Sequence, residues 1–346
     1  MKKIIFTSIC LFLIAATAKT NAQNEAQYKL SDKIKIAGND HWDYLAADTL
    51  TGRIFISHGN EVQVLDEKSK KIIGTIPDTK GVHGIAIAYD LNKGFISDGK
   101  DSAVTVFDLT SLKTITKVPV TGQNPDCILY DTFTQRVFAF NGRTSNCTII
   151  DAKTNKVIGT LFLEGKPEFA VSDGQGKIFV NLENRNMICQ INAQTFMGEK
   201  TFSIAPGESP SGLAIDVKNH ILFSGCDNKK MIIVNAQTGQ VITTLPIGEG
   251  VDAVAFDPVL KRAYSSNGDG TLTVVQEENP KSFKVIANVA TQKGARTLAL
   301  DSKTQHIYLS TAEFGAPTEV ANGQKRKRPS IVENSFVLLQ IDVLTK

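Results

Sequence analysis

The chain has 346 residues, of which 42% are hydrophobic and 21% charged, the composition of an ordinary globular protein large enough to bury a substantial core. Its formal net charge is +3, but three lysines lie ahead of an expected cleavage point at residue 22, and without them the charge is zero. A neutral chain has no overall field to attract nucleic acid or an anionic membrane surface, so nucleic acid is not an expected partner.

The N-terminus has the features of a secretory signal peptide. Two lysines precede an apolar stretch over residues 4–18, and residues 20–22 supply a small-residue cleavage site. The apolar run is short for a membrane span, and no second one follows it. We therefore expect residues 1–22 to be removed and residues 23–346 to form one domain without a membrane span. The mature protein is expected in the periplasm or outside the cell, as a monomer.

After this segment, one short phrase recurs seven times. A polar residue opens an apolar run that ends in Asp or a similar residue, and a second apolar run follows a turn, as in HGIAIAYD then GFISDG. The opening residues, spaced 40 to 44 positions apart, are Asp43, His83, Asp126, Glu168, Ser211, Asp252 and Arg296. A fixed period of this size, built from short strands, is typical of a β-propeller, in which equivalent positions gather around one central channel.

Each repeat predicts four strands, named a to d from the channel to the rim. In the first repeat they are WDYLAAD, RIFISHG, EVQVLD and KIIGTIP. The last repeat has no fourth strand before the chain ends, but residues 27–38 read like the other d strands. An N-terminal strand that completes the last blade would remove two open sheet edges. We predict an all-β, seven-bladed propeller with four-stranded blades, the last closed by this strand.

Several polar residues and all mature cysteines are expected to be structural. Asp66, Asp108, Asp151 and Asn235 each precede a tight turn after strand c, where such side chains cap their own backbone. The four cysteines after residue 22 fall in positions that do not suggest pairs, so free and mostly buried thiols are favoured over disulfides.

No motif identifies a known organic cofactor. The chain has no CxxCH or GxGxxG motif, and its single tryptophan does not suit the tryptophan-rich docking of a quinone cofactor. Nothing in the sequence therefore indicates haem, NAD or PQQ.

A ligand site is predicted at one mouth of the channel. The connections from d to a and from b to c emerge on one face, so the opening residues and the residues 15 positions later should ring this mouth. The candidate ligand-binding residues are Asp43, His58, His83, Asp126, Asn141, Glu168, Ser211, Asp252, Asn267 and Arg296. Varied polar groups that converge on a concavity are usual in ligand sites. The alternative is a water-filled channel whose polar residues only solvate it.

Three residues have distinct possible roles. His83 lies between small neighbours that would leave its ring free to reach the channel, and it is a candidate general acid or base. Arg296 could form an internal ion pair or clamp a carboxylate or phosphate, and it is the second catalytic candidate. Trp42 could provide a stacking wall or pack in the core.

A metal and a lid are further hypotheses. The oxygen ligands of Asp43, Asp126, Glu168, Asp252, Asn141 and Asn267 would suit a hard divalent cation such as calcium if they converge. Residues 313–335 form the longest irregular segment, between strands b and c of the last repeat. This segment is either a lid over the mouth or a solvated loop with a cluster of basic residues.

The chain also resembles a known family. The phrases GQNPDCILYD, GKPEFAVSDGQGKIFVN, SPSGLAIDVKNHILFSGC, GVDAVAFDP and TQKGARTLALDSKTQHIYLSTAEFG are similar to exported YncE-like proteins of the YVTN β-propeller repeat superfamily. The resemblance covers almost the whole mature chain and implies a seven-bladed propeller in the periplasm or outside the cell. The wider group has been linked to nucleic-acid binding, to surface layers and, by fold, to lactonases and streptogramin lyases. By comparison with the lactonases, the metal set would be Glu168, Asn141, Asn267 and Asp252.

Three functions remain open. The favoured one is a binding module that holds a small polar ligand or a protein partner at the channel mouth, without defined catalysis. The second is a metal-assisted lyase or lactone hydrolase, with a site assembled from several blades. The third is a structural or surface-interaction propeller.

Overall fold

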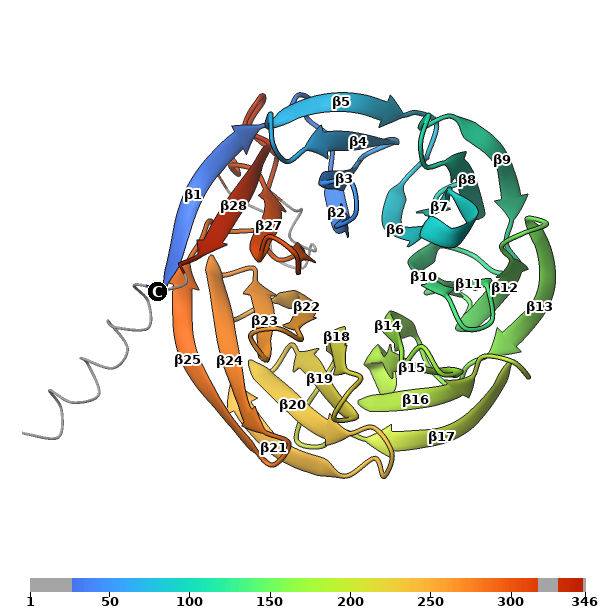
Figure 1. Ribbon diagram of the computed structural model, residues 1–346, viewed down its shortest axis with the longest axis vertical. Helices are drawn as coiled ribbons and strands as arrows, with labels where there is room; N and C mark the ends of the chain where they lie inside the picture. Colours follow the sequence, from blue (N-terminus) through green and yellow to red (C-terminus); the bar gives the residue numbers. More distant parts are fainter. Residues whose placement is uncertain (1–26, 317–328, 345–346) are drawn as a thin grey trace, which may run out of the picture.

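The computed structural model describes residues 27–316 and 329–344, which contain β-strands and two short 3-10 turns, η1 (Tyr89–Leu91) and η2 (Glu183–Arg185). The strands form seven four-stranded antiparallel sheets arranged as blades around a central axis (Figure 1). The chain is therefore a seven-bladed β-propeller, which confirms the predicted fold class. The predicted signal peptide, residues 1–22, lies outside the described residues.

The first three blades follow the chain from the channel to the rim. Blade 1 consists of β2 (Trp42–Asp48), β3 (Arg53–His58), β4 (Glu61–Asp66) and β5 (Lys71–Ile76). Blade 2 consists of β6 (Val82–Ala88), β7 (Lys93–Asp98), β8 (Ala103–Asp108) and β9 (Thr114–Pro119). Blade 3 consists of β10 (Pro125–Asp131), β11 (Arg136–Asn141), β12 (Asn146–Asp151) and β13 (Lys156–Phe162).

The next three blades repeat this order. Blade 4 consists of β14 (Pro167–Ser172), β15 (Lys177–Leu182), β16 (Met187–Asn192) and β17 (Met197–Ser203). Blade 5 consists of β18 (Pro210–Asp216), β19 (Ile221–Cys226), β20 (Lys230–Asn235) and β21 (Val241–Pro246). Blade 6 consists of β22 (Val251–Asp257), β23 (Arg262–Asn267), β24 (Thr271–Asn279) and β25 (Ser282–Ala290).

The two ends of the described chain meet in blade 7. Its order is β26 (Leu298–Asp301), β27 (His306–Thr311), β28 (Val337–Val343) and β1 (Tyr28–Lys35), with β1 at the rim beside β28 (Figure 1). Antiparallel pairing runs from Tyr28 with Val343 to Lys35 with Val337. The predicted closure by an N-terminal strand is confirmed, and it covers the edge of β28 that would otherwise be exposed.

The hydrophobic core is divided among the blade interfaces. Seven clusters of buried apolar side chains each lie between two adjacent blades, for example Phe55, Ile85 and Phe107 between blades 1 and 2. Alternate side chains of a strand point to opposite faces of its sheet, so each blade contributes to two clusters. The blades therefore pack against one another around the ring, and polar side chains can occupy the axis.

The turn residues and cysteines are as expected. Asp66, Asp108, Asp151 and Asn235 each accept a hydrogen bond from a backbone N–H three residues later, at 2.7 to 2.9 Å. The four cysteines of the described chain are free and buried, which confirms the preference for unpaired thiols. Among the described residues, no helix is long and apolar enough to cross a membrane.

Candidate functional site at the channel mouth

A β-bulge at the start of the inner strand turns the opening residue out of the sheet in blades 1 to 6. In blade 1, the regular pairing of β2 with β3 is interrupted between Trp42 and Leu45, so Asp43 and Tyr44 lie in the bulge. Inner strands β6, β10, β14, β18 and β22 are interrupted at the equivalent place. In blade 7, Arg296 precedes β26. A bulge bends its strand and re-aims the side chains there, which directs these residues to the channel.

Side chains of neighbouring blades hold the backbone of these bulges. The Thr297 hydroxyl donates to the carbonyl of Asp43 at 2.9 Å, and the Ser97 hydroxyl donates to the carbonyl of Asp126 at 2.5 Å. Equivalent bonds run from blade 4 to blade 5 and from blade 6 to blade 7. The positions of Asp43, Asp126, Ser211 and Arg296 therefore depend on the adjacent blade as well as on their own strands.

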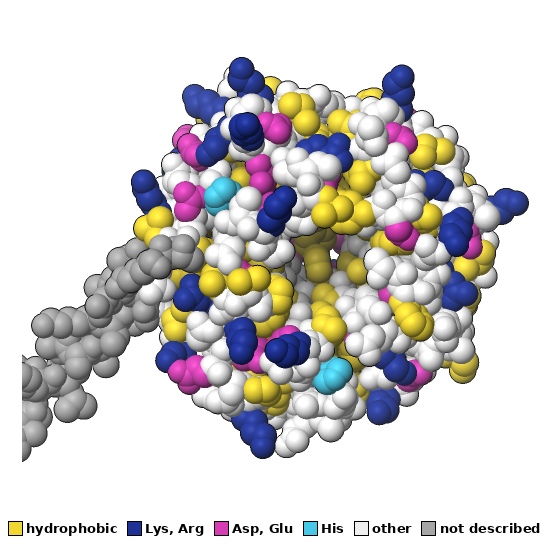
Figure 2. All heavy atoms as spheres, in the orientation of Figure 1, with side chains coloured by type: hydrophobic (Ala, Val, Ile, Leu, Met, Phe, Trp, Pro, Cys, Tyr) yellow, Lys and Arg dark blue, Asp and Glu magenta, His cyan; other side chains and the backbone are white. Residues whose placement is uncertain are grey.

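The bulges open into one cavity of about 670 Å³. All seven predicted opening residues line it: Asp43, His83, Asp126, Glu168, Ser211, Asp252 and Arg296. The lining carries seven carboxyl groups, four lysine or arginine side chains and His83, so acidic and basic groups face one another across the cavity. The ring shape of the molecule and its central opening are visible in Figure 2, which shows one face.

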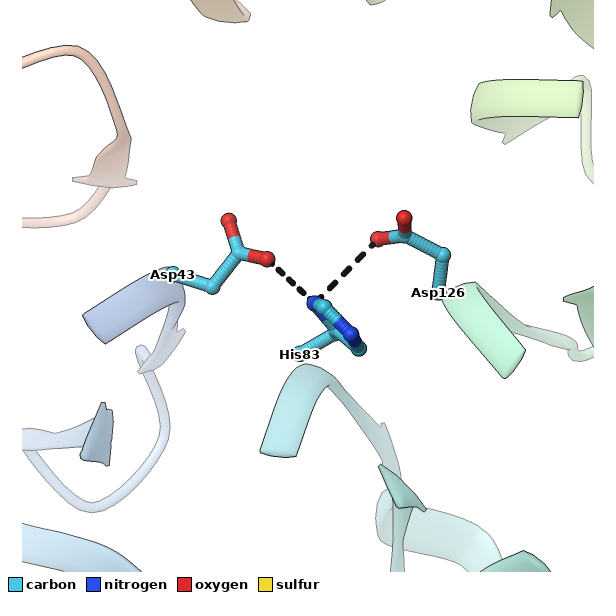
Figure 3. Close-up of side chains that lie close together, drawn as sticks. All are labelled: Asp43, His83 and Asp126. Carbon is cyan, nitrogen blue, oxygen red and sulfur yellow. Dashed lines mark hydrogen bonds and ion pairs between the residues drawn. The ribbon is translucent and has the colours of Figure 1, made fainter. Parts of the chain in front are cut away.

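His83 joins two carboxylates from the neighbouring blades (Figure 3). Its Nδ1 lies 2.5 Å from Asp43 Oδ2 and 3.7 Å from Asp126 Oδ1. Burial alone would lower the pKa of His83, but the hydrogen bond to Asp43 and the charges of Asp126 and Asp43 raise it to about 9. Burial raises the pKa of Asp126 to about 6, against the opposing charge of His83. At neutral pH the ring is an imidazolium between the two acids.

A second charged group lies across blades 5 to 7. Arg296 Nε is 3.1 Å from Asp252 Oδ2, and the Ser211 hydroxyl donates to Asp252 Oδ1 at 2.8 Å. Burial raises the pKa of Asp252 to about 6, although Arg296 and Ser211 lower it. The Arg296 side chain remains 44% exposed, so part of its guanidinium can contact a ligand while the ion pair persists. Of the two alternatives for Arg296, the structure shows the ion pair.

Blade 4 supplies the third charged group. Lys166 Nζ lies 2.5 Å from both Glu168 Oε1 and Glu183 Oε2. Burial and the nearby Asp126 raise the pKa of Glu168, whereas Lys166 opposes this shift. The acids of the mouth therefore form ion pairs with cations of the protein itself. A ligand must either displace these ion pairs or bind to the parts of the charged groups that they leave free.

Tyr44 and Phe169 form a part of the site that the sequence analysis did not identify. They follow Asp43 and Glu168 directly, and their rings meet edge to face with centroids 5.2 Å apart, although they come from blades 1 and 4. Tyr44 is 5% exposed, and no hydrogen bond to its hydroxyl is formed by the described residues. Burial raises its pKa well above the usual value, and the carboxylates of the mouth raise it further.

The sequence did contain a signal for this pair. The residue after the opening position is small in most blades, whereas it is aromatic in blades 1 and 4. Only the tertiary structure shows that the two aromatic rings reach one another across the axis.

The structure corrects the prediction for the residues 15 positions after the opening residues, at the end of strand b. His58, Asn141 and Asn267 are at most 2% exposed and do not line the cavity. His58 stacks on Phe336 with centroids 4.3 Å apart, and Asn141 donates to Thr148 at 3.0 Å. Asn267 makes corresponding bonds within blade 6. The reason is register: the last residue of strand b pairs with the residue before the bulge, so its side chain stays on a face of the sheet.

The predicted metal set is not brought together either. Asn141 and Asn267 are buried inside their blades, while Glu168 and Asp252 contact Lys166 and Arg296. Within the described part of the chain, a different group has ligand atoms within 4.8 Å of one another: Asp43, His83 and Asp126.

Two further hypotheses concern the rim of the mouth. Trp42 packs on Phe336 with centroids 5.2 Å apart and on Phe314 at 6.1 Å, so it is part of the packing, although it also lines the cavity. The segment 313–335 is described only at its two ends, which a bridge between Phe314 and Ile331 joins. Its centre, residues 317–328, lies outside the described residues, and the lid stays a prediction.

A larger hollow of about 890 Å³ lies elsewhere, between blades 4 and 5. It is lined by residues of the a-to-b and c-to-d turns, including Gln175, Thr195, His220 and Gln237, and so lies on the opposite face. None of the seven opening residues contributes to it. The convergence of charged groups distinguishes the smaller cavity as the candidate site.

The fold and this cavity define a seven-bladed β-propeller with a polar, charged channel mouth. No protein-family model matches the chain, and no curated protein matches it.

Solved propeller structures are similar in fold. The structure of U3-55K has a TM-score of 0.73 at 11% identity, over 91% of this chain and 98% of that one. The WD40 repeats of RRP9 give 0.73 at 10% identity over the same shares. A chain of the mitotic checkpoint complex gives 0.71 at 15%, over 81% of this chain and 87% of that one. These similarities establish the propeller fold.

Proposed function

We propose that this chain is an exported, YncE-like β-propeller that binds a small polar ligand at the channel mouth. One observation carries the proposal: seven equivalent positions, one from each blade, converge on a single cavity and differ in chemistry. Turn formation alone would be served by one residue type in every blade. The variation is what a site needs in order to recognise several different groups on a ligand.

The charges suggest the kind of ligand. The exposed part of Arg296 can receive a carboxylate or phosphate, while the carboxyl groups of Asp43, Asp126 and Glu168 can accept hydrogen bonds from hydroxyl or amino groups. A ligand with an anionic group and hydrogen-bond donors would match both sides of the cavity. The aromatic pair Tyr44 and Phe169 offers an apolar surface beside them.

Ligand binding can be tested by thermal shift. Residues 23–346 would be screened against amino acids, sugars, sugar acids and phosphorylated metabolites. A ligand at one hundred times its Kd stabilises the folded state by about 2.7 kcal/mol. Arg296→Gln should remove this stabilisation, whereas Lys229→Gln should not, because Lys229 pairs with Glu249 outside the cavity.

The outcomes separate the alternatives. Stabilisation that Arg296→Gln leaves intact would place the ligand elsewhere and refute the proposed site. A protein partner is the alternative occupant of the mouth, and the similarity to a chain of the mitotic checkpoint complex, an assembly, supports it. A stable complex with a partner, and no small-molecule ligand, would favour that alternative.

Export has its own test. The signal peptide predicts that protein recovered from the periplasm or medium begins at residue 23, which intact-mass measurement would show. Full-length protein retained in the cytoplasm would contradict export without affecting the binding proposal.

A further inference from the structure

Asp43, His83 and Asp126 come from three consecutive blades and point to one spot at the channel mouth (Figure 3). Their ligand atoms lie within 4.8 Å of one another. Carboxylate oxygens and an imidazole nitrogen bind first-row divalent metals at about 2.0 to 2.2 Å, so a group of this size needs only small side-chain movements. Each residue stands at a bulge of its inner strand, and a hydroxyl of the preceding blade donates a hydrogen bond to the carbonyl of Asp43 and to that of Asp126.

The imidazole is already oriented as metal-binding histidines usually are. Nδ1 faces the two carboxylates. Nε2 lies against Gly99, where a Cβ atom would come within 2.6 Å of it. The amide oxygen of Asn124 lies beside the same glycine, where it can accept the Nε2 proton and so leave Nδ1 for the metal. The glycine makes room for the ring in this orientation.

A further polar group can contact a ligand at this place. The Tyr44 side chain is 5% exposed and lines the same cavity, and its hydroxyl makes no hydrogen bond with the described residues. The carboxylates that act on this hydroxyl are those of the mouth, with Asp252 first and Asp126 and Asp43 after it. The hydroxyl can therefore donate a hydrogen bond to a group bound in the cavity, such as the coordinated water of a metal ion.

We propose that Asp43, His83 and Asp126 bind a first-row divalent transition metal ion such as Zn²⁺, with open coordination positions facing the channel. The ion takes the place of the proton between His83 and Asp43. The nitrogen ligand favours such an ion over Ca²⁺, which prefers oxygen ligands. The inference rests on the proposed function, because the metal would form part of the ligand site and would bind an anionic group there.

The test uses residues 23–346 freed of metal by a chelator, with Zn²⁺ and Co²⁺ as probes. Calorimetry should show one Zn²⁺ per chain, and Co²⁺ should give visible absorption bands that Zn²⁺ abolishes. His83→Gln and Asp126→Asn should each weaken Zn²⁺ binding at least about tenfold, as losses in the ligand shell do. Circular dichroism would verify that each variant is folded, and the two variants provide independent readings.

The matched control is another histidine near a carboxylate. His306 Nε2 lies 3.6 Å from Asp342 Oδ1 in blade 7, outside the cavity. His306→Gln should leave Zn²⁺ binding unchanged. Absence of stoichiometric binding, or equal affinity in wild type and His83→Gln, would overturn the metal site. A metabolite that binds the metal-free protein in an Arg296-dependent way would still support the proposed function, so the two can fail separately.

Discussion

Asp98, at the end of β7, provides a sharp test of the electrostatics near the mouth. It is 0% exposed, its Oδ2 accepts a hydrogen bond from Thr105 at 2.5 Å, and its Oδ1 has no partner in the described chain. Burial raises its pKa from 3.8 to about 7, and the nearby Asp101 and Asp78 contribute, while Thr105 and Lys117 oppose the shift. Replacement by Asn removes the charge and nearly preserves the shape.

The direction in which pH changes the stability follows from the pKa of Asp98 in the folded and in the unfolded state. The folded state binds the Asp98 proton more tightly than the unfolded state, so the wild type loses stability as pH rises from about 4 to about 7. At about 1.4 kcal/mol per pKa unit, ionisation of Asp98 lowers the free energy of unfolding of the wild type by up to about 2 kcal/mol at pH 5 and by about 4 kcal/mol at pH 8. Asp98→Asn should therefore stabilise the protein, and more strongly at pH 8.

Urea unfolding at pH 5 and pH 8 measures this difference. Thr105→Val is the matched comparison, since it removes the hydroxyl that donates to Asp98 and should destabilise the protein more at pH 8 than at pH 5. An equal effect of Asp98→Asn at both pH values, or destabilisation at pH 8, would refute the conclusion that Asp98 is a buried carboxyl group with a raised pKa.

Three further predictions concern the ring and its core. Deletion of residues 23–35 removes β1 and should abolish cooperative thermal unfolding, since β28 loses its partner, whereas deletion of residues 23–26 should not. The four buried cysteines should react with a thiol reagent only after denaturation; any missing thiol in the denatured protein would indicate a disulfide. Tyr44→Phe should change the free energy of unfolding by less than about 0.5 kcal/mol, whereas Tyr44→Ala should cost about 2 to 4 kcal/mol by loss of contact with Phe169. If urea unfolding showed the same loss of stability for Tyr44→Phe as for Tyr44→Ala, the Tyr44 hydroxyl would have to make a hydrogen bond.

Much of the fold could be predicted because each repeat consists of local sequence patterns. Alternating apolar runs, turn residues such as Asp66 and a period of 40 to 44 residues specify strands and blades without long-range information. The predicted strand at residues 27–38 supplied the missing fourth strand of the seventh blade, because an open ring would expose two sheet edges. The opening residues of the site could be predicted for the same reason, since equivalent positions share one place around the axis.

The identity of the rest of the site depended on tertiary contacts. The residue at the end of strand b has the same spacing from each opening residue, but the bulge at Asp43 changes the register, and His58 is buried as a result. The sequence alone does not show such a bulge.

The sequence by itself determined the propeller, its closure and the polar ring at its mouth, because these follow from periodic burial and unpaired sheet edges. Only the tertiary structure decided which side chains meet. His83 joins Asp43 and Asp126, and Tyr44 reaches Phe169, because the packing of the blades sets the distances across the axis. His83 is 40 positions from Asp43 and 43 from Asp126, and Phe169 is 125 from Tyr44, so no local pattern encodes these contacts.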